Sequence, residues 1–188
     1  MLSESVNNLI GESCNGDYNA FRKLMQMYQQ RVYSFVFRMI CNEDDARDIV
    51  QETFIKVWQN LASYNSKYSF NTWLYKIASN CCFDFLRTRK RSRLVYVDEA
   101  GLEAAISTAI NVDRLLDNKE IIAVTTYLCN NLTEKQRIVF ILKELEMLTT
   151  GEVSAITGLS PEKIKSNLYL AKKNIREQLS KYFNNENE

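Results

Sequence analysis

Residues 69–93 read SFNTWLYKIASNCCFDFLRTRKRSR. Apolar side chains recur in this stretch at steps of three and four, the spacing of the buried side of a long amphipathic helix; they are Phe70, Trp73, Leu74, Ile77, Ala78, Cys81 and Phe85. Within this stretch no acidic residue follows Asp84. The stretch ends in the basic residues Arg87, Arg89, Lys90, Arg91 and Arg93. The stretch predicts a core helix whose cationic end contacts nucleic-acid phosphates. The alternative is a solvated last turn whose cations favour the helix dipole.

The composition favours an all-α protein. The 188 residues are 46% hydrophobic and include one proline and five glycines, which leaves few turn signals for a chain of strands. The 24 basic and 23 acidic residues give a net charge of +1, so nucleic-acid binding requires local segregation of charge. The five cysteines show neither a disulfide framework nor metal-ligand spacing. Without a signal peptide or an apolar run of membrane-spanning length, we expect a cytoplasmic protein.

Two helices are expected before the opening stretch, over residues 17–41 and from Asn42, the expected N-cap, to about residue 60. The outer side of the second carries Asp48, Gln51 and Glu52. Carboxylates on one outward helix face do not converge on a cation from several directions, so we expect no metal site. The remaining interpretation from the residues alone is a solvated face on which Glu52 supports Lys56.

Two connecting segments divide the chain. Residues 62–69 form a loop containing Tyr64 and Tyr68, whose rings either pack on the core or stack on unpaired bases. Residues 95–113 are acidic and only weakly periodic, as is typical of a flexible linker, although a short helix from about Ala104 is compatible with the alanines. We therefore expect two small helical domains, over residues 9–94 and 114–184.

The second domain contains a helix-turn-helix pattern. Helical spacing over residues 114–130 is followed by a capping box, Thr133 with Gln136, that starts a helix over residues 134–145. Thr150 is the expected cap of the next short helix, Gly158 the turn, and Ser160 the cap of a helix that starts at Pro161. The exposed side of this last helix is lysine-rich and suits a DNA groove, the alternative being an ordinary helical hairpin.

Three segments together resemble one protein family. They are DDARDIVQETFIKVWQN at residues 44–60, FNTWLYKIASNCCFDFLR at residues 70–87, and LTEKQRIVFILKELEMLTTGEVSAITGLSPEKIKSNLYLAKKNIREQL at residues 132–179. In this order they are similar to the extracytoplasmic-function (ECF) sigma factors, the small two-domain specificity subunits of bacterial RNA polymerase. The resemblance covers residues 17–183, nearly the whole chain.

The resemblance implies three binding sites. Asp48, Gln51 and Glu52 would dock on the coiled coil of the largest subunit of core RNA polymerase. Tyr64, Phe70 and Asn80 would line a pocket for an extruded base of the minus-ten promoter element, with Arg87, Arg89, Lys90, Arg91 and Arg93 on the phosphates beside it. Lys165, Ser166 and Tyr169 would contact bases of the minus-thirty-five element, and Lys172 and Lys173 its phosphates.

The resemblance also implies partners and regulation. The partners would be core polymerase, promoter DNA and a membrane-anchored anti-sigma factor, with no cofactor and no small-molecule substrate, and the linker would thread the RNA exit channel of the polymerase. Family members commonly carry arginine where this chain has Asn167 and Leu170, so bidentate reading of guanine is lost there.

Two other classes of function compete with this interpretation. A free-standing helix-turn-helix regulator predicts a ligand pocket and often a symmetric dimer, and it leaves the Asp48 to Glu52 face unexplained. An enzyme such as a metal-dependent nuclease would need histidine, a glycine-rich phosphate loop or converging carboxylates, and the sequence lacks these parts. We therefore expect no catalysis.

Overall fold

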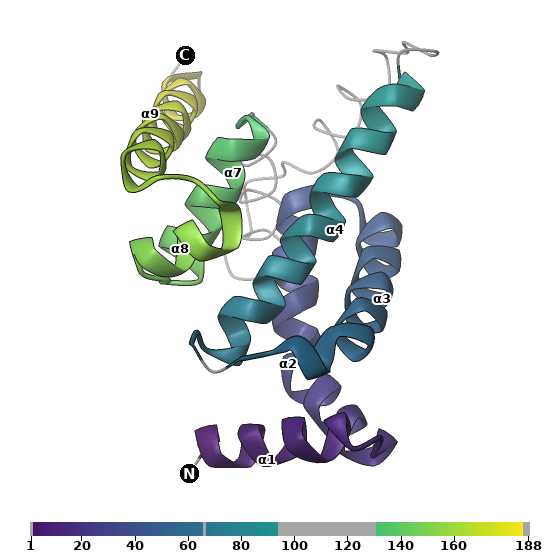
Figure 1. The fold of residues 1–188 in the computed structure, drawn as a ribbon. Helices are drawn as coiled ribbons and strands as arrows, with labels where there is room; N and C mark the ends of the chain where they lie inside the picture. The colour runs from purple at the N-terminus through teal and green to yellow at the C-terminus, as the bar shows by residue number, and fades with distance from the viewer. Residues whose placement is uncertain (1, 66, 94–130, 186–188) are drawn as a thin grey trace. The chain divides into compact units, whose positions relative to one another are not determined.

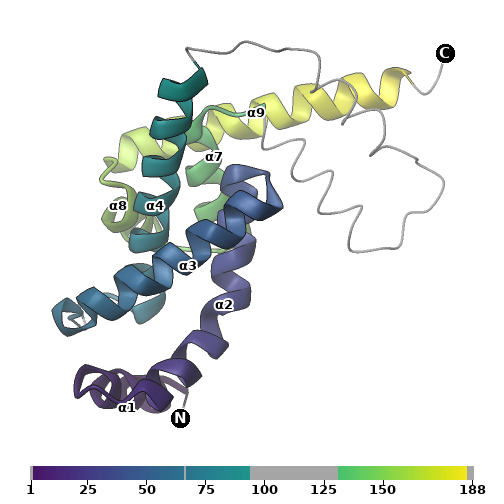
Figure 2. The same ribbon diagram turned by 90° about the vertical axis from the view of Figure 1, so that its right-hand side faces the viewer.

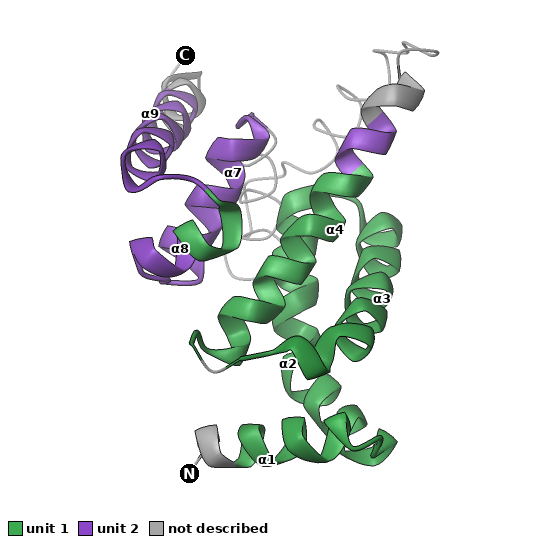
Figure 3. Cartoon of the chain, in the orientation of Figure 1, with its two compact units in different colours: residues 1–85, 154–158 green, residues 86–153, 159–188 purple. Residues whose placement is uncertain are grey.

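The computed structural model describes residues 2–65, 67–93 and 131–185. Every regular element in these ranges is helical (Figure 1), which confirms the all-α prediction. The chain divides into two compact units, residues 1–85 with 154–158 and residues 86–153 with 159–188 (Figure 3). None of the helices described is long and apolar enough to cross a membrane.

The N-terminal part consists of four α-helices and one short 3-10 helix: α1 (Leu2–Cys14), α2 (Tyr18–Ile40), α3 (Glu43–Asn60), η1 (Leu61–Ser63) and α4 (Phe70–Arg93). Asp17 caps α2, since its carboxylate accepts hydrogen bonds from the backbone N–H groups of Asn19 and Ala20. Asn42 caps α3 in the same way through Asp45, as predicted. The helices over residues 17–41 and 42–60 are thus confirmed.

Helix α1 was not predicted. It packs on α2 and η1 and lies across one end of the N-terminal helices in both Figure 1 and Figure 2. Its described buried side chains are Val6, Ile10 and Ser13, at steps of four and three. The apolar residues Leu2, Val6, Leu9 and Ile10 span little more than two helical turns and Gly11 follows them, so the pattern is too short to identify the helix from sequence.

The core of the N-terminal part forms between α2, α3 and α4. The fully buried rings of Phe35 on α2 and Tyr75 on α4 lie with their centroids 5.0 Å apart. Of the predicted α4 stripe, Phe70, Leu74, Ala78 and Cys81 are buried, whereas Trp73, Ile77 and Phe85 are partly exposed. Tyr75, Ser79 and Cys82 lie outside the predicted stripe and are nevertheless buried, so the buried side of α4 is wider than predicted.

The C-terminal part contains α7 (Glu134–Phe140), the π-helical turn η2 (Ile141–Leu145), α8 (Thr150–Thr157) and α9 (Pro161–Asn185). The capping box of Thr133 with Gln136 is present, and the helix predicted over residues 134–145 ends in the wider π turn. Gly158 has a φ of 70°, and the Ser160 hydroxyl accepts a hydrogen bond from the Lys163 backbone at 3.4 Å. The predicted turn and α9 start are confirmed.

The predicted cap of α8 was wrong by one residue. Thr149, not Thr150, is the cap: its hydroxyl accepts from the Glu152 backbone at 3.3 Å, and Glu152 Oε2 accepts from the Thr149 backbone at 2.9 Å. This is the reciprocal capping box that a Thr followed three residues later by Glu can form. The predicted linker over residues 95–113 and the helical spacing over residues 114–130 lie outside the described residues.

Candidate functional site

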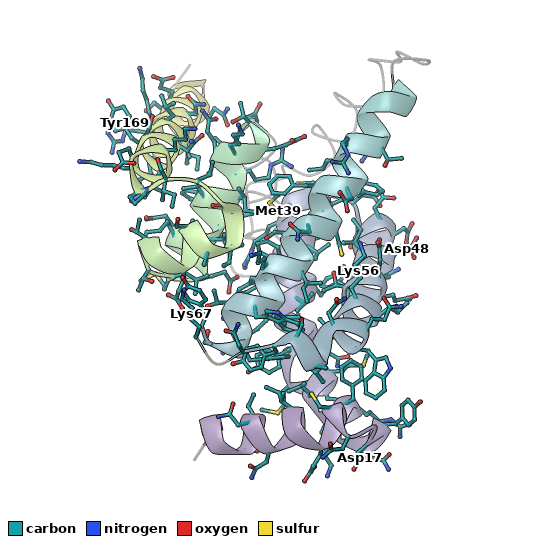
Figure 4. The ribbon with its side chains drawn as sticks, in the orientation of Figure 1. Asp17, Met39, Asp48, Lys56, Lys67 and Tyr169 are labelled. Atoms are coloured by element: carbon teal, nitrogen blue, oxygen red, sulfur yellow. The ribbon has the colours of Figure 1, made fainter. Side chains whose placement is uncertain are left out.

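The polar side of α3 is exposed, as predicted. Asp48, Gln51 and Glu52 all face solvent, and Figure 4 shows Asp48 on the outer side of the helix. Burial of the opposite side of α3, which includes Ala46, Ile49 and Thr53, fixes this orientation. Glu52 Oε1 lies 2.7 Å from Lys56 Nζ, and this hydrogen bond raises the pKa of Lys56. We call Asp48, Gln51, Glu52 and Ile55 the α3 face.

Ile55 is the member of the α3 face that the sequence reasoning missed. Its side chain is 57% exposed. It follows Gln51 and Glu52 by four and three residues, so the helical period places all three on one side. An exposed isoleucine among polar side chains is the type of anchor that a protein interface buries. Three residues further on, Trp58 stacks on the exposed Tyr18 ring, with centroids 5.0 Å apart.

A cavity of about 530 Å³ lies beside the loop that precedes α4. We call it the loop pocket, and it is lined by Val6, Asn7, Met27, Tyr28, Arg31, Tyr64, Lys67, Tyr68, Ser69, Phe70 and Asn71. The Tyr64 and Phe70 rings meet edge to face at 5.5 Å, and Tyr28 meets Phe70 at 5.2 Å. Burial raises the pKa of the Tyr28 and Tyr64 hydroxyls.

Asn80 lies in a different cavity. This cavity of about 410 Å³, here called the helix pocket, is lined by Lys56, Asn60, Ser63, Trp73, Lys76, Ile77, Asn80 and Asp84. The expectation that Asn80 lines one pocket with Tyr64 and Phe70 does not match this geometry. Trp73 contacts Tyr64 at 5.5 Å and Phe70 at 5.7 Å, so an aromatic cluster links the residues of the two pockets.

The basic end of α4 is described in part. Arg87 and Arg89 are exposed, and the helix continues to Arg93. The side chains of Lys90, Arg91 and Arg93 lie outside the described residues.

The predicted DNA-binding side of α9 is exposed. Lys165, Ser166 and Tyr169 all face solvent, and Figure 4 shows Tyr169 on the outer side of α9. Buried Ile164 and Ala171 hold the opposite side of the helix. Arg176 is also exposed, and it lies seven residues after Tyr169, on the same side. Arg176 was not among the predicted DNA-binding residues, although its helical spacing from Lys165 and Tyr169 indicates that it lies on the same side.

The two predicted phosphate-binding lysines of α9 are paired with acids. Lys172 Nζ lies 2.7 Å from Glu144 Oε2 on the π turn η2, and Lys173 Nζ lies 3.8 Å from Glu177. Both pairs are partly exposed to solvent. Each pair is therefore weak enough for a phosphate to compete for the lysine.

The described residues offer no metal centre, because no three of their His, Cys, Asp or Glu side chains are arranged to hold an ion. What these residues present instead is a mixed polar and apolar helix face, two pockets joined by an aromatic cluster, and a basic helix face.

Comparison with known families matches both parts of the chain. The family described as sigma-70 region 2 matches residues 24–92, and the family described as sigma-70 region 4 matches residues 127–175. The ECF RNA polymerase sigma factor SigW of Bacillus subtilis strain 168 is 29% identical over 172 residues, which cover 87% of this chain and 91% of that protein.

A second relative extends this match. The ECF RNA polymerase sigma-E factor of Escherichia coli K12 is 30% identical over 166 residues, which cover 85% of this chain and 86% of that protein. The solved structures that share the fold include CnrH in complex with the cytosolic domain of CnrY, and the sigma factor RpoE in complex with the anti-sigma factor NepR from Bartonella quintana.

Both structures have a TM-score of 0.68. CnrH is 20% identical, with coverage of 94% of this chain and 97% of its own, and RpoE is 22% identical, with coverage of 85% and 96%. The two family regions occur in the order of the three quoted segments and include α3, nearly all of α4, α7, α8 and the first part of α9, up to residue 175. The chain belongs to the ECF subfamily of sigma-70-type RNA polymerase sigma factors.

Proposed function

We propose that this chain binds core RNA polymerase and directs initiation at promoters with a minus-ten and a minus-thirty-five element. The observation that carries the proposal is the order of the two family regions along one chain, each with exposed side chains suited to its role. Sigma factors assist initiation without catalysing it, and we extend this to the present chain, which acts without chemistry of its own. A free-standing helix-turn-helix regulator would leave the region-2 match and the α3 face unused.

The α3 face is the polymerase-docking surface. Asp48 and Glu52 bring negative charge to a partner with basic side chains, and exposed Ile55, one turn after Gln51 and Glu52, supplies an apolar contact. An apolar anchor within a polar surround is the arrangement that concentrates binding energy in protein interfaces. We assign the coiled coil of the largest polymerase subunit to this face.

The loop pocket and the helix pocket bind the minus-ten element. Bases extruded from a duplex are held by stacking on aromatic rings and by hydrogen bonds to their edges. Tyr64 and Phe70 supply rings in the loop pocket, and Asn80 supplies an amide in the helix pocket. The basic end of α4, from Arg87 to Arg93, neutralises the phosphates of the same strand.

Helix α9 reads the minus-thirty-five element. Its exposed Lys165, Ser166 and Tyr169 lie within the first nine residues of the helix, the part that enters the major groove in helix-turn-helix proteins. Lys172 and Lys173 bind phosphates further along. Without arginine at positions 167 and 170, the preferred sequence is set by contacts other than bidentate guanine recognition.

The chain is organised as two domains joined by a linker. The matched regions lie inside the proposed domains, residues 9–94 and 114–184, with residues 95–113 as the linker between them. The chain acts in the cytoplasm, where polymerase and promoters are. We also propose a membrane-anchored anti-sigma factor as its inhibitor, in line with the anti-sigma factor bound to the RpoE relative.

Transcription in vitro tests the proposal. The purified chain is mixed with core RNA polymerase and fragmented genomic DNA, and the 5′ ends of the transcripts are sequenced. We expect initiation at sites that share two sequence blocks and that core polymerase alone does not use. If the chain bound duplex DNA tightly yet neither associated with polymerase nor changed its start sites, the regulator hypothesis would replace this one.

A further inference from the structure

Helix α1 forms part of the loop pocket. Val6 and Asn7 line the cavity from α1, Tyr28 and Arg31 line it from α2, and Tyr64 lines it from the loop before α4. Val6 is buried, and α1 packs on both α2 and η1, so this helix is fixed against the pocket. The region-2 match begins at residue 24, after the end of α1. The α1 side of the pocket therefore lies outside the part of the chain that the family defines.

The loop pocket holds aromatic rings and cations, two kinds of group that bind an unpaired nucleotide. The partly exposed Tyr28 and Tyr64 rings line the cavity and suit a base, and the buried Phe70 ring packs against both of them. The exposed cations Arg31 and Lys67 line the same cavity and suit a phosphate. The volume of about 530 Å³ lies in the range of small-ligand sites, roughly 300 to 1,000 Å³.

Two amide side chains line the pocket in addition. Asn7 comes from α1 and is exposed, so its amide is accessible to a ligand. Asn71 comes from the first turn of α4, and its Oδ1 is buried without a hydrogen-bond partner. A ligand whose N–H reached this acceptor would give it a hydrogen-bond partner.

We propose that α1 is a wall of the base-binding pocket and that Asn7, with Asn71, reads the hydrogen-bonding edge of one extruded minus-ten base. This inference rests on the proposed minus-ten function. Asn7 is a specificity-determining residue supplied by the segment that precedes the family region. The helix pocket, which contains Asn80, receives no contribution from α1 and serves a different position of the strand.

The chain offers a matched control at the next residue. Asn8 has the same side chain, lies on the same helix and is also exposed, but it does not line the loop pocket. One residue along an α-helix is a rotation of about 100°, which separates the two amides. Asn7→Ala and Asn8→Ala therefore remove the same chemical group from the same helix, and only the first removes it from the pocket.

The experiment measures base preference with complete holoenzyme. Holoenzyme is assembled with the wild-type chain, Asn7→Ala, Asn8→Ala or Asn7→Gln. Each is used to select DNA from a pool of promoter fragments whose minus-ten segment is unpaired and randomised, and the bound DNA is sequenced. We expect Asn7→Ala to lower the preference at one position by roughly five- to tenfold, the effect of one hydrogen bond. Asn8→Ala should match the wild type, and Asn7→Gln should retain part of the preference.

A DNA that is abasic at the affected position gives a second readout. Wild-type and Asn7→Ala holoenzymes should bind it equally, because the contact partner of Asn7 is absent. The inference is overturned if Asn7→Ala keeps the wild-type preference, or if it weakens binding equally at every position, as a loss of structure would. A wild-type holoenzyme with no preference anywhere in the unpaired segment would overturn the minus-ten function, and the inference with it.

Discussion

Met147 occupies a backbone conformation that a glycine would adopt without strain. Its φ is 55° and its side chain is 80% exposed, so the strain is not offset by burial. A left-handed conformation costs a residue with a side chain about 1 to 2 kcal/mol. We expect Met147→Gly to raise the free energy of unfolding by about 1 kcal/mol in urea titration.

Met147→Ala serves as the control for that substitution. Alanine removes the same long side chain but keeps the Cβ that causes the strain. It should leave stability within about 0.5 kcal/mol of the wild type, as exposed substitutions usually do. An equal gain from both variants would place the effect in the side chain instead of the backbone.

Lys172 and Lys173 provide a second prediction for individual residues. Phosphates carry no sequence information, so Lys172→Ala and Lys173→Ala should weaken duplex binding by a similar factor on all sequences. Log K falls as log salt concentration rises, and each lost phosphate contact should make this fall shallower by about 0.9. Binding measured over a salt series on two unrelated duplexes checks both, with exposed Lys135→Ala on α7 as the control. A loss confined to one duplex would identify the lysine as a base reader.

The α3 face is a property of a whole helix, and its test removes the charges together. We expect Asp48→Ala with Glu52→Ala to abolish association with core polymerase, because the double variant removes both charges of the proposed docking surface and interface hot spots each cost about 2 kcal/mol or more on truncation. Ile55→Ala alone should weaken association more than tenfold. Affinity is measured with labelled chain and core polymerase, and circular dichroism checks the fold.

The control for the α3 face is Glu12→Ala, which removes an exposed acid from α1. This variant should bind polymerase as the wild type does. Normal binding by the Asp48 and Glu52 variant would remove the docking assignment, and a comparable loss in Glu12→Ala would show that total charge matters instead of position.

Most helices could be predicted from sequence because apolar periodicity and caps agree in them. Asn42, the Thr133 capping box and Pro161 each mark a helix start that the structure reproduces. Helix α1 could not be predicted, since it buries few apolar side chains and depends on tertiary packing against α2. The pockets could not be predicted either. Whether Asn80 and Tyr64 share a cavity depends on side-chain directions around Trp73, which sequence spacing leaves open.

For the whole molecule, the net charge of +1 gives no general attraction to DNA. Affinity must come from local groups, and these lie on different helices from the α3 face. The Asp48 and Glu52 variant should therefore retain duplex binding by α9. Conversely, Lys165→Ala with Tyr169→Ala should lose more than tenfold in affinity for minus-thirty-five DNA and keep polymerase binding.

Gel-shift and polymerase-association measurements on the same two variants test this separation. A polymerase defect in the α9 variant, or a duplex defect in the α3 variant, would show that the two functions depend on each other in the free chain. Both proteins should unfold at temperatures close to that of the wild type, because the substituted side chains are exposed.

The positions of the tryptophans within the aromatic contacts described above determine what the intrinsic fluorescence of the protein reports. Its two tryptophans are Trp58, stacked on Tyr18 beside the α3 face, and Trp73, in the aromatic cluster that links the two pockets. Residues 86–188 contain none, so intrinsic tryptophan fluorescence follows the N-terminal part alone. Substituting one tryptophan by phenylalanine leaves a single tryptophan, which lies either beside the polymerase-docking face or beside the base pockets. The unlabelled protein thus carries separate optical reporters for docking and for base capture.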